Sequence, residues 1–204
     1  MIRRSFLLCL PGLVLAAAAR AQYRSVARGE VLRGHFRQER QIKGFDRPLV
    51  STGDFVLAPG EGLIWRTDHP FAIVTVITAA GLVQEVDGTE TTRLTASRLP
   101  FLARLYDLLG AALSGDWQAL GTQFQVTRHG DARKWDFELV PLPGTDPMAL
   151  PFRTIALHGG SFLNEVRIVR LDDDSDRLMF SDQTLGTGGL SEAEAAHLRR
   201  AKGP

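Results

Sequence analysis

The stretch at residues 51–71, STGDFVLAPGEGLIWRTDHPF, decides the fold class. It divides into two strands at Pro59 and Gly60, because proline and glycine supply the backbone angles that a tight turn requires. Along both strands the apolar residues fall on both faces. An antiparallel strand with one face in water alternates apolar and polar residues instead. This hairpin therefore predicts a sheet that is covered on both of its faces.

Similar strand-like segments continue on both sides of this hairpin. Short runs rich in β-branched and aromatic residues are separated by turn residues, mainly Gly, Pro and Asp. The runs lie at residues 35–42, 50–58, 62–67, 71–78, 81–86, 89–96, 122–128, 134–141, 151–158, 162–171 and 177–184. We expect a mainly β (α+β) fold, built on a strongly curved antiparallel sheet of about ten or eleven strands.

Two helices are predicted beside these strands. Leucines recur at steps of three or four residues between the sixth and seventh strands, which is typical of an amphipathic helix; they are Leu99, Leu102, Leu105, Leu109 and Leu113. Near the C-terminus, Ser191 and Glu194 have the spacing of a capping box. A short last helix should therefore begin after Ser191 and reach about Arg200.

The apolar faces of the sheet need covers. In the segment FAIVTVIT, Phe71, Ile73 and Ile77 alternate with Ala72, Val74 and Val76, so neither face is suited to water. The leucine helix can cover part of one face, but one helix is too small for about ten strands. A curled sheet can turn the surplus surface into an internal cavity for a lipid-sized ligand. The alternative is a barrel that side chains fill completely.

The N-terminus has the pattern of a secretory signal peptide. Arg3 and Arg4 precede an apolar run at residues 6–18, and Ala19-Arg20-Ala21 matches an A-x-A cleavage site. We expect residues 1–21 to be removed and residues 22–204 to form one exported domain. Cys9 lies in the leader, so the mature chain would have no disulfide, cysteine nucleophile or cysteine metal site.

The charge of the mature chain argues against nucleic acid as a partner. The full chain has a formal net charge of +1, and removal of the three leader arginines leaves 21 Lys and Arg residues against 23 Asp and Glu residues. A mature chain with a net charge near −2 lacks the excess of basic residues that would attract nucleic acids or anionic lipid surfaces. We expect a monomer that binds no nucleic acid.

The sequence contains no convincing catalytic or metal-binding motif. His158-Gly159-Gly160 is similar to the oxyanion-hole segment of some esterases, but no G-x-S-x-G motif supplies a nucleophile. The acidic run Asp172–Asp176 lacks the glycine and closing glutamate of a calcium loop. We expect no catalytic residues, no metal and no cofactor, with a lipid-acting hydrolase as the less favoured alternative.

A set of loose motifs occurs in a recognisable order. They are Phe36-Arg37-Gln38, Gly53-Asp54-Phe55 on a strand ending at Pro59, Trp65 followed by Pro70, Pro100-Phe101, Asp116-Trp117, and Leu139-Val140-Pro141. In this order the chain resembles the periplasmic outer-membrane lipoprotein carrier proteins, the LolA-like family, over about residues 31–198. The match continues through the 166–180 hairpin and the entry to the last helix.

The resemblance implies an unclosed barrel or half-barrel with a helical lid over a hydrophobic cavity. Members of the family bind the acyl chains of lipoproteins, accept them from an inner-membrane export complex and deliver them to an outer-membrane acceptor. They act as chaperones in outer-membrane biogenesis rather than as enzymes. Two alternatives stay open, a LolA-like carrier for another envelope lipid or glycolipid, and a scaffold with a filled interior.

The resemblance also suggests which residues bind the ligand. Those of the cavity and lid would be Phe55, Leu57, Leu63, Trp65, Phe71, Ile73, Leu102, Leu105, Leu109, Val166 and Ile168. Family members carry an arginine just before the proline that ends the Gly-Asp strand, where it holds the lid closed. This chain has Ala58 before Pro59, and Arg40 and Arg66 are the candidates to replace that arginine.

Overall fold

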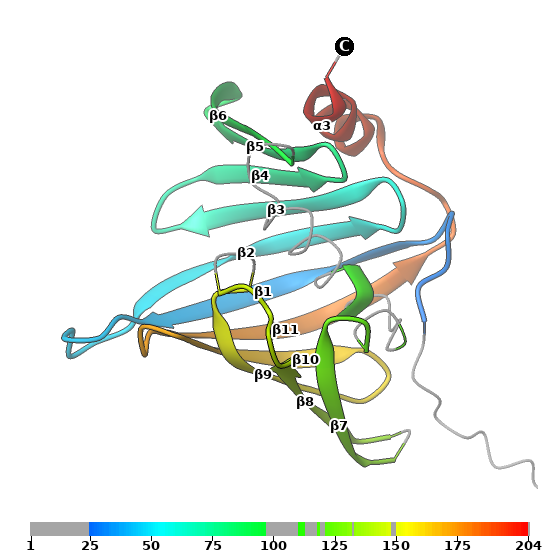
Figure 1. The fold of residues 1–204 in the computed structure, drawn as a ribbon. Coiled ribbons are helices and arrows are strands. Elements are labelled where there is room, and N and C mark those ends of the chain that lie inside the picture. Colours follow the sequence, from blue (N-terminus) through cyan, green and yellow to red (C-terminus); the bar gives the residue numbers. More distant parts are fainter. Residues whose placement is uncertain are drawn as a thin grey trace, which may run out of the picture.

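Eleven antiparallel strands form a single sheet in this computed structural model (Figure 1). The structure describes residues 25–96, 110–112, 118, 121–131, 133–147 and 150–203. The strands are β1 (Val31–Gln41), β2 (Leu49–Ala58), β3 (Gly62–His69), β4 (Ile73–Thr78), β5 (Gly81–Val86), β6 (Thr89–Thr95), β7 (Phe124–Gly130), β8 (Trp135–Pro141), β9 (Phe152–Gly159), β10 (Leu163–Arg170) and β11 (Ser175–Gly186). Each overlaps a segment predicted from the sequence, although β1 begins four residues earlier than predicted and β11 is longer at both ends.

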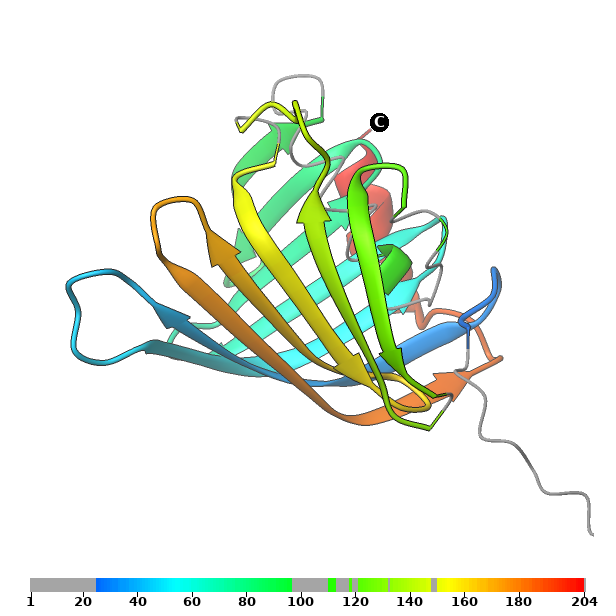
Figure 2. The same cartoon turned by 60° about the horizontal axis from the view of Figure 1, so that its bottom comes forward.

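The strand order explains how the sheet curves. The order is β6-β5-β4-β3-β2-β1-β11-β10-β9-β8-β7, so the first and last strands of the chain pair in the middle of the sheet. β6 and β7 are the two edges, and the sheet does not close into a barrel. Figure 2 shows the curl, with β7–β10 facing β2–β4 across the interior. The predicted fold, an unclosed and strongly curved antiparallel sheet, is confirmed.

The β2–β3 hairpin divides its side chains between the two faces of the sheet. Gly60, with φ of +81°, occupies the turn where the sequence predicts it. Phe55 pairs with Trp65 and points to the inner face, whereas Val56 pairs with Ile64 and points to the outer face. Both pairs are apolar because both faces of this hairpin are covered.

The outer face of β2–β5 is covered by the C-terminal helix α3 (Glu192–Lys202). Leu198 and Ala201 of the helix are buried against alternate strand residues. This outer cluster consists of Val31, Val56, Ala58, Ile64, Val76, Val83, Leu198 and Ala201. The outer apolar face of the β2–β3 hairpin therefore packs under α3. The sequence predicted that the leucine helix could cover one face without indicating which, and it did not identify α3 as the cover of the outer face.

The described part of the leucine helix packs on the inner side of the sheet. Residues 110–112 are helical, and Ala111 and Ala112 belong to the same buried cluster as inner-face strand residues such as Phe55 and Leu63. The leucines at positions 99, 102, 105, 109 and 113 lie outside the described residues. α3 and this helical stretch consequently lie on opposite faces of the sheet, because each contributes to a different cluster.

A capping box and an ion pair fix the start of α3. The Ser191 side chain accepts from the backbone of Glu194, and the Glu194 side chain accepts from the backbone of Ser191, as predicted. Glu194 also binds Arg33 of β1, with Nη2–Oε2 at 2.6 Å and Nε–Oε1 at 2.9 Å. The hydrogen bonds from Arg33 lower the pKa of Glu194 to about 2. The pair ties the helix to the central strands.

The outer face of β1, β10 and β11 is polar. Arg177 donates to Glu165 at 2.9 Å, and Arg167 also pairs with Glu165. These arginines hold the pKa of Glu165 below its usual value, Arg177 having the larger effect. Arg37 and Glu39 extend the same row of charges. The outer face is therefore polar at these three strands, whereas its buried apolar cluster lies under α3.

Candidate functional site

The inner face of the curled sheet is a continuous apolar surface. Residues from β1–β4 and from β7–β11 belong to one cluster. Because the sheet curls, β7–β10 face β2–β4 across this apolar surface (Figure 2). From the strands these are Leu32, Phe36, Phe55, Leu57, Leu63, Ile77, Phe124, Trp135, Phe137, Leu139, Phe152, Ile155, Leu157, Leu163, Val166, Ile168, Leu178 and Phe180. We call this set the interior cluster.

Four aromatic rings meet in the middle of the interior cluster. Phe36 and Trp65 stack with their centroids 3.8 Å apart. Phe180 lies edge-on to Phe55 at 5.4 Å and to Trp65 at 6.1 Å. Gly53 is the cross-strand partner of Phe36, so the rings of Phe36 and Trp65 stack across β2. Trp65 packs against the interior cluster but stays partly exposed, which leaves an accessible aromatic surface on this face.

Most of the predicted ligand-binding residues in the described part of the chain share this face. Phe55, Leu57, Leu63, Val166 and Ile168 are buried in the interior cluster, together with the adjoining Trp65. They come from β2, β3 and β10, which are far apart in the sequence. That they share one face is confirmed, and their role in binding a ligand stays a prediction.

Two of the predicted positions depart from this arrangement, and three lie outside the described residues. Phe71 precedes β4, is 73% exposed and lies outside the interior cluster, and its assignment to the cavity stays a prediction. Pro70 separates Phe71 from the end of β3. Phe71 therefore lies outside a strand, and strand alternation does not determine which face its side chain is on. Ile73 is half-buried and is not among the residues packed against either cluster. Leu102, Leu105 and Leu109 are the lid positions that the structure does not describe.

Several interior residues were not predicted as ligand-binding residues. Phe36 and Phe180 complete the aromatic group, and Ile155 and Leu157 of β9 contribute the opposite wall. The signal was present, since apolar residues alternate along all of these strands. Alternation does not say which face is concave, so it could not separate these residues from ordinary core.

The structure places the two candidate replacements for the family arginine on different faces. Ala58 is 4% exposed and belongs to the outer cluster under α3. Arg66 pairs with Asp54 at 2.8 Å, and the two residues are cross-strand partners beside a shallow hollow on the outer face. Arg40 has the same strand parity as Phe36 and lies on the inner face. Of the two arginines, only Arg40 can reach a ligand in the interior.

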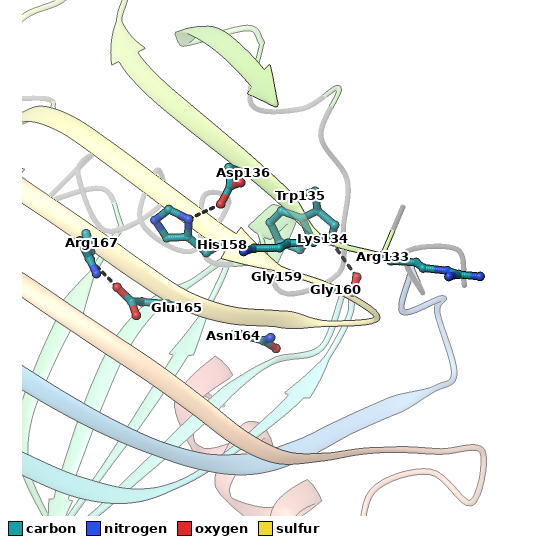
Figure 3. Close-up of a pocket in the computed structure, with 10 residues that line it drawn as sticks. All are labelled: Arg133, Lys134, Trp135, Asp136, His158, Gly159, Gly160, Asn164, Glu165 and Arg167. Atoms are coloured by element: carbon teal, nitrogen blue, oxygen red, sulfur yellow. Dashed lines mark hydrogen bonds and ion pairs between the residues drawn. The ribbon is translucent and has the colours of Figure 1, made fainter. Parts of the chain in front are cut away.

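A polar groove of about 570 Å³ lies on the outside of β8–β10 (Figure 3). His158 pairs with Asp136, and the Trp135 indole donates to the carbonyl of Gly160 at 2.7 Å. A Cβ at Gly159 would lie 2.2 Å from the Trp135 ring, so glycine is needed for this packing. No serine is among the described residues that line the groove. The His158-Gly159-Gly160 segment thus has a structural explanation.

The described part of the chain offers neither a metal site nor a membrane-spanning helix. No group of three or more His, Cys, Asp or Glu residues there is placed to hold a metal ion. No helix within the described ranges is both long enough and apolar enough to cross a membrane. The interior cluster is therefore the main candidate site.

Solved structures with a similar course of the chain share little sequence with it. A LolA superfamily protein from Nitrosomonas europaea is 7% identical, with 82% of this chain and 90% of that chain covered and a TM-score of 0.42. A putative outer membrane lipoprotein-sorting protein domain from Vibrio parahaemolyticus is 11% identical, with coverages of 87% and 93% and a TM-score of 0.41. The lipoprotein LppX from Mycobacterium tuberculosis is 10% identical, with coverages of 78% and 88% and a TM-score of 0.40.

Comparison with sequence families is more informative. No curated protein sequence gives a significant match to this chain. The profile described as "Outer membrane lipoprotein carrier protein LolA-like" matches residues 16–199, which is most of the chain. The curled open sheet with an apolar inner face is the fold that the resemblance predicted. The chain belongs to the LolA-like family of outer membrane lipoprotein carrier proteins.

Proposed function

We propose that the protein is a periplasmic carrier that binds the acyl chains of lipoproteins in its interior and ferries them from the inner to the outer membrane. The observation that carries the proposal is the apolar inner face shared by both halves of the sheet, with Trp65 partly exposed on it. Family membership supports a carrier role. In this proposal residues 1–21 direct export and are removed, and residues 22–204 form the single carrier domain.

The energetics of acyl binding favour a carrier with an adjustable interior. Burial of an acyl chain contributes about 0.8 kcal/mol per methylene group, so a few chains provide a large binding free energy. Transfer to an acceptor then depends on release. A sheet that does not close can change its curvature more easily than a closed barrel, because β6 and β7 are not joined to each other. Donor and acceptor proteins in the two membranes are the partners that this role requires.

The identity of the cargo has one specific alternative. The position of the family arginine is occupied by Ala58, which faces α3 and not the interior. A lid that lacks this contact favours cargo other than a lipoprotein. Under this alternative the protein is a LolA-like carrier for another envelope lipid or glycolipid, and it has no enzymatic activity. Lipid extraction from the purified protein distinguishes the two by the head group.

Replacing Trp65 by glutamate tests the interior as the binding site. The carboxylate would lie beside Phe36 and would remain unpaired when an acyl chain covers it, which is strongly unfavourable. We expect the amount of bound lipid, measured by native mass spectrometry and lipid extraction, to fall at least about tenfold. Because Trp65 is only partly buried, circular dichroism should still report a folded sheet.

Phe71→Glu is the matched control for this experiment. Phe71 is six residues away and 73% exposed, so the same aromatic-to-acid change should leave lipid loading close to that of the unchanged protein. Equal loading of Trp65→Glu and the unchanged protein, with both folded, would rule out the interior face as the binding site. Hydrolysis of model acyl esters by the unchanged protein would support the hydrolase alternative instead.

A further inference from the structure

The inner face of the sheet becomes polar at one end. By strand alternation, Gln38 and Arg40 of β1 continue the face that Phe36 begins, and Asp176 of β11 continues the face of Leu178. Arg40 and Asp176 are cross-strand partners. Arg170, at the end of β10, completes the group through its contact with Asp176. We call Gln38, Arg40, Arg170 and Asp176 the rim cluster.

Asp176 is the fixed centre of the rim cluster. Its side chain is only 2% exposed. One carboxylate oxygen accepts from the Gln38 amide at 3.0 Å. The other accepts from Nε and Nη2 of Arg170, at 3.0 Å and 2.8 Å. Three charge-assisted or amide donors thus satisfy the carboxylate, and Arg170 balances its charge.

Arg40 is the cation in excess. Its Nε lies 3.8 Å from the nearer Asp176 oxygen, which is too far for a hydrogen bond. This nitrogen is shielded from solvent and has no hydrogen-bond partner among the described residues. The rim cluster contains two arginines and one carboxylate, so it carries a formal charge of +1. A shielded, unsatisfied donor of a cationic group is unfavourable until an acceptor reaches it.

The charged residues beyond the rim cluster do not neutralise its excess positive charge. Lys43 and Arg153 lie beyond the cluster, at the hairpin tips, and both pair with Asp173. Lys43 also donates from its backbone to Asp174 at 2.9 Å, which joins the β1–β2 and β10–β11 hairpins at the edge where Figure 1 shows them side by side. These contacts hold the hairpins together without Arg40. The guanidinium of Arg40 is thus not needed for that junction.

The rim cluster adjoins the interior cluster, so an amphiphile whose acyl chain lies on the interior cluster could place its polar head group at the rim cluster. Ile168 is the cross-strand partner of Asp176 and belongs to the interior cluster. Arg40 is four residues along β1 from Phe36, a distance of about 13 Å at 3.3 Å per residue. An acyl chain lying against the aromatic group and extended along β1 would bring its polar end to Arg40.

We propose that Arg40, beside the Arg170–Asp176 pair, binds the anionic head group of an acylated lipid. The ligand class is a phosphate or carboxylate oxyanion attached to an acyl chain. Arg40 would donate to it from its guanidinium, whose Nε has no acceptor among the described residues. This inference rests on the proposed carrier function and narrows its substrate class. A lipid anchor with a neutral head group would not use the site.

Binding of lipids with matched acyl chains tests the proposal. One pair consists of phosphatidylglycerol and diacylglycerol, and the other consists of oleate and methyl oleate. We expect Arg40→Gln to weaken binding of one anionic probe about tenfold and to leave the neutral member of that pair unchanged. The pair that responds identifies a phosphate or a carboxylate as the head group. Arg37→Gln, three residues earlier on the outer face, is the control and should change neither pair.

The outcomes separate this site from the carrier function. If Arg40→Gln weakens charged and neutral members equally, or changes neither, head-group recognition by Arg40 is overturned and the carrier function stands. If the unchanged protein takes up none of the four probes, the carrier function itself fails. A merely structural Arg40 would lower the urea unfolding midpoint of Arg40→Gln relative to Arg37→Gln without any preference for head-group charge, which would also overturn the proposal.

Discussion

Replacing Gly53 by alanine is expected to lower the free energy of unfolding by about 3 kcal/mol or more. A Cβ at this position would lie 1.8 Å from the carbonyl oxygen of Arg66 and 3.0 Å from Cα of Thr67, so the backbone of β3 would have to move away from β2. The same movement would disturb the stack of Phe36 on Trp65, which crosses β2 at Gly53. Urea unfolding followed by circular dichroism measures the loss.

Gly188→Ala is the control for this prediction. Gly188 has no atom within 4 Å of the added Cβ and no positive φ, so its replacement should change the free energy of unfolding by less than about 0.5 kcal/mol. A Gly53→Ala protein as stable as Gly188→Ala would show that β2 and β3 are not as close as described. Under the carrier proposal, Gly53→Ala should also reduce lipid loading, because Trp65 would lose its fixed position.

Replacing Glu194 by glutamine is expected to lower the free energy of unfolding by about 2–3 kcal/mol near pH 7. The change keeps a side chain that can accept from the Ser191 backbone, so the capping box survives. It removes the charge that pairs with Arg33, whose donor atoms lie 2.6 Å and 2.9 Å from the carboxylate. Release of α3 would expose the outer cluster, including Leu198.

The pH dependence gives this prediction a second test. The pKa of Glu194 is about 2 in the folded protein, compared with 4.5 for a glutamate that lacks these interactions. The folded state therefore favours the ionised form, and the stabilisation is complete above about pH 4.5 and is lost as the pH falls toward 2. The difference in unfolding free energy between the unchanged protein and Glu194→Gln should be largest near pH 7 and should shrink near pH 3.

Glu61→Gln provides the comparison for an exposed ion pair. Lys202 lowers the pKa of Glu61, but the Glu61 side chain is 53% exposed. Solvent screens such a pair, so its removal should cost less than about 1 kcal/mol at any pH. Equal effects of Glu61→Gln and Glu194→Gln would contradict the view that the Arg33–Glu194 pair holds α3 on the sheet.

The strands were predictable because their signals are local. Turn residues separate the apolar runs, and the β2–β3 turn occurs at Gly60 as the sequence indicates. The capping box at Ser191 and Glu194 was read correctly for the same reason, since a capping box needs only residues three apart. Phe71 lies outside the interior cluster because the chain between β3 and β4 does not follow the strand alternation on which its prediction relied.

The candidate site was predictable only in part. Alternation correctly grouped Phe55 with Leu57 and Val166 with Ile168, because residues two apart on one strand share a face. It could not show that β2 and β10 face the same interior, since that depends on the curl of the whole sheet. It also could not find the rim cluster, because Arg40, Arg170 and Asp176 are brought together by the pairing of β1 with β11 and β11 with β10.

Hydrophobic periodicity and turn chemistry act over a few residues, so they were enough to predict the strands, the last helix and the need for two covered faces. That α3 covers the outer face, and that both halves of the sheet share the inner face, follows only from how the chain packs. The same packing places Arg40 inside and Arg66 outside. The physical reason is that covering and facing depend on long-range packing, which brings together residues more than 100 positions apart, such as Arg33 and Glu194.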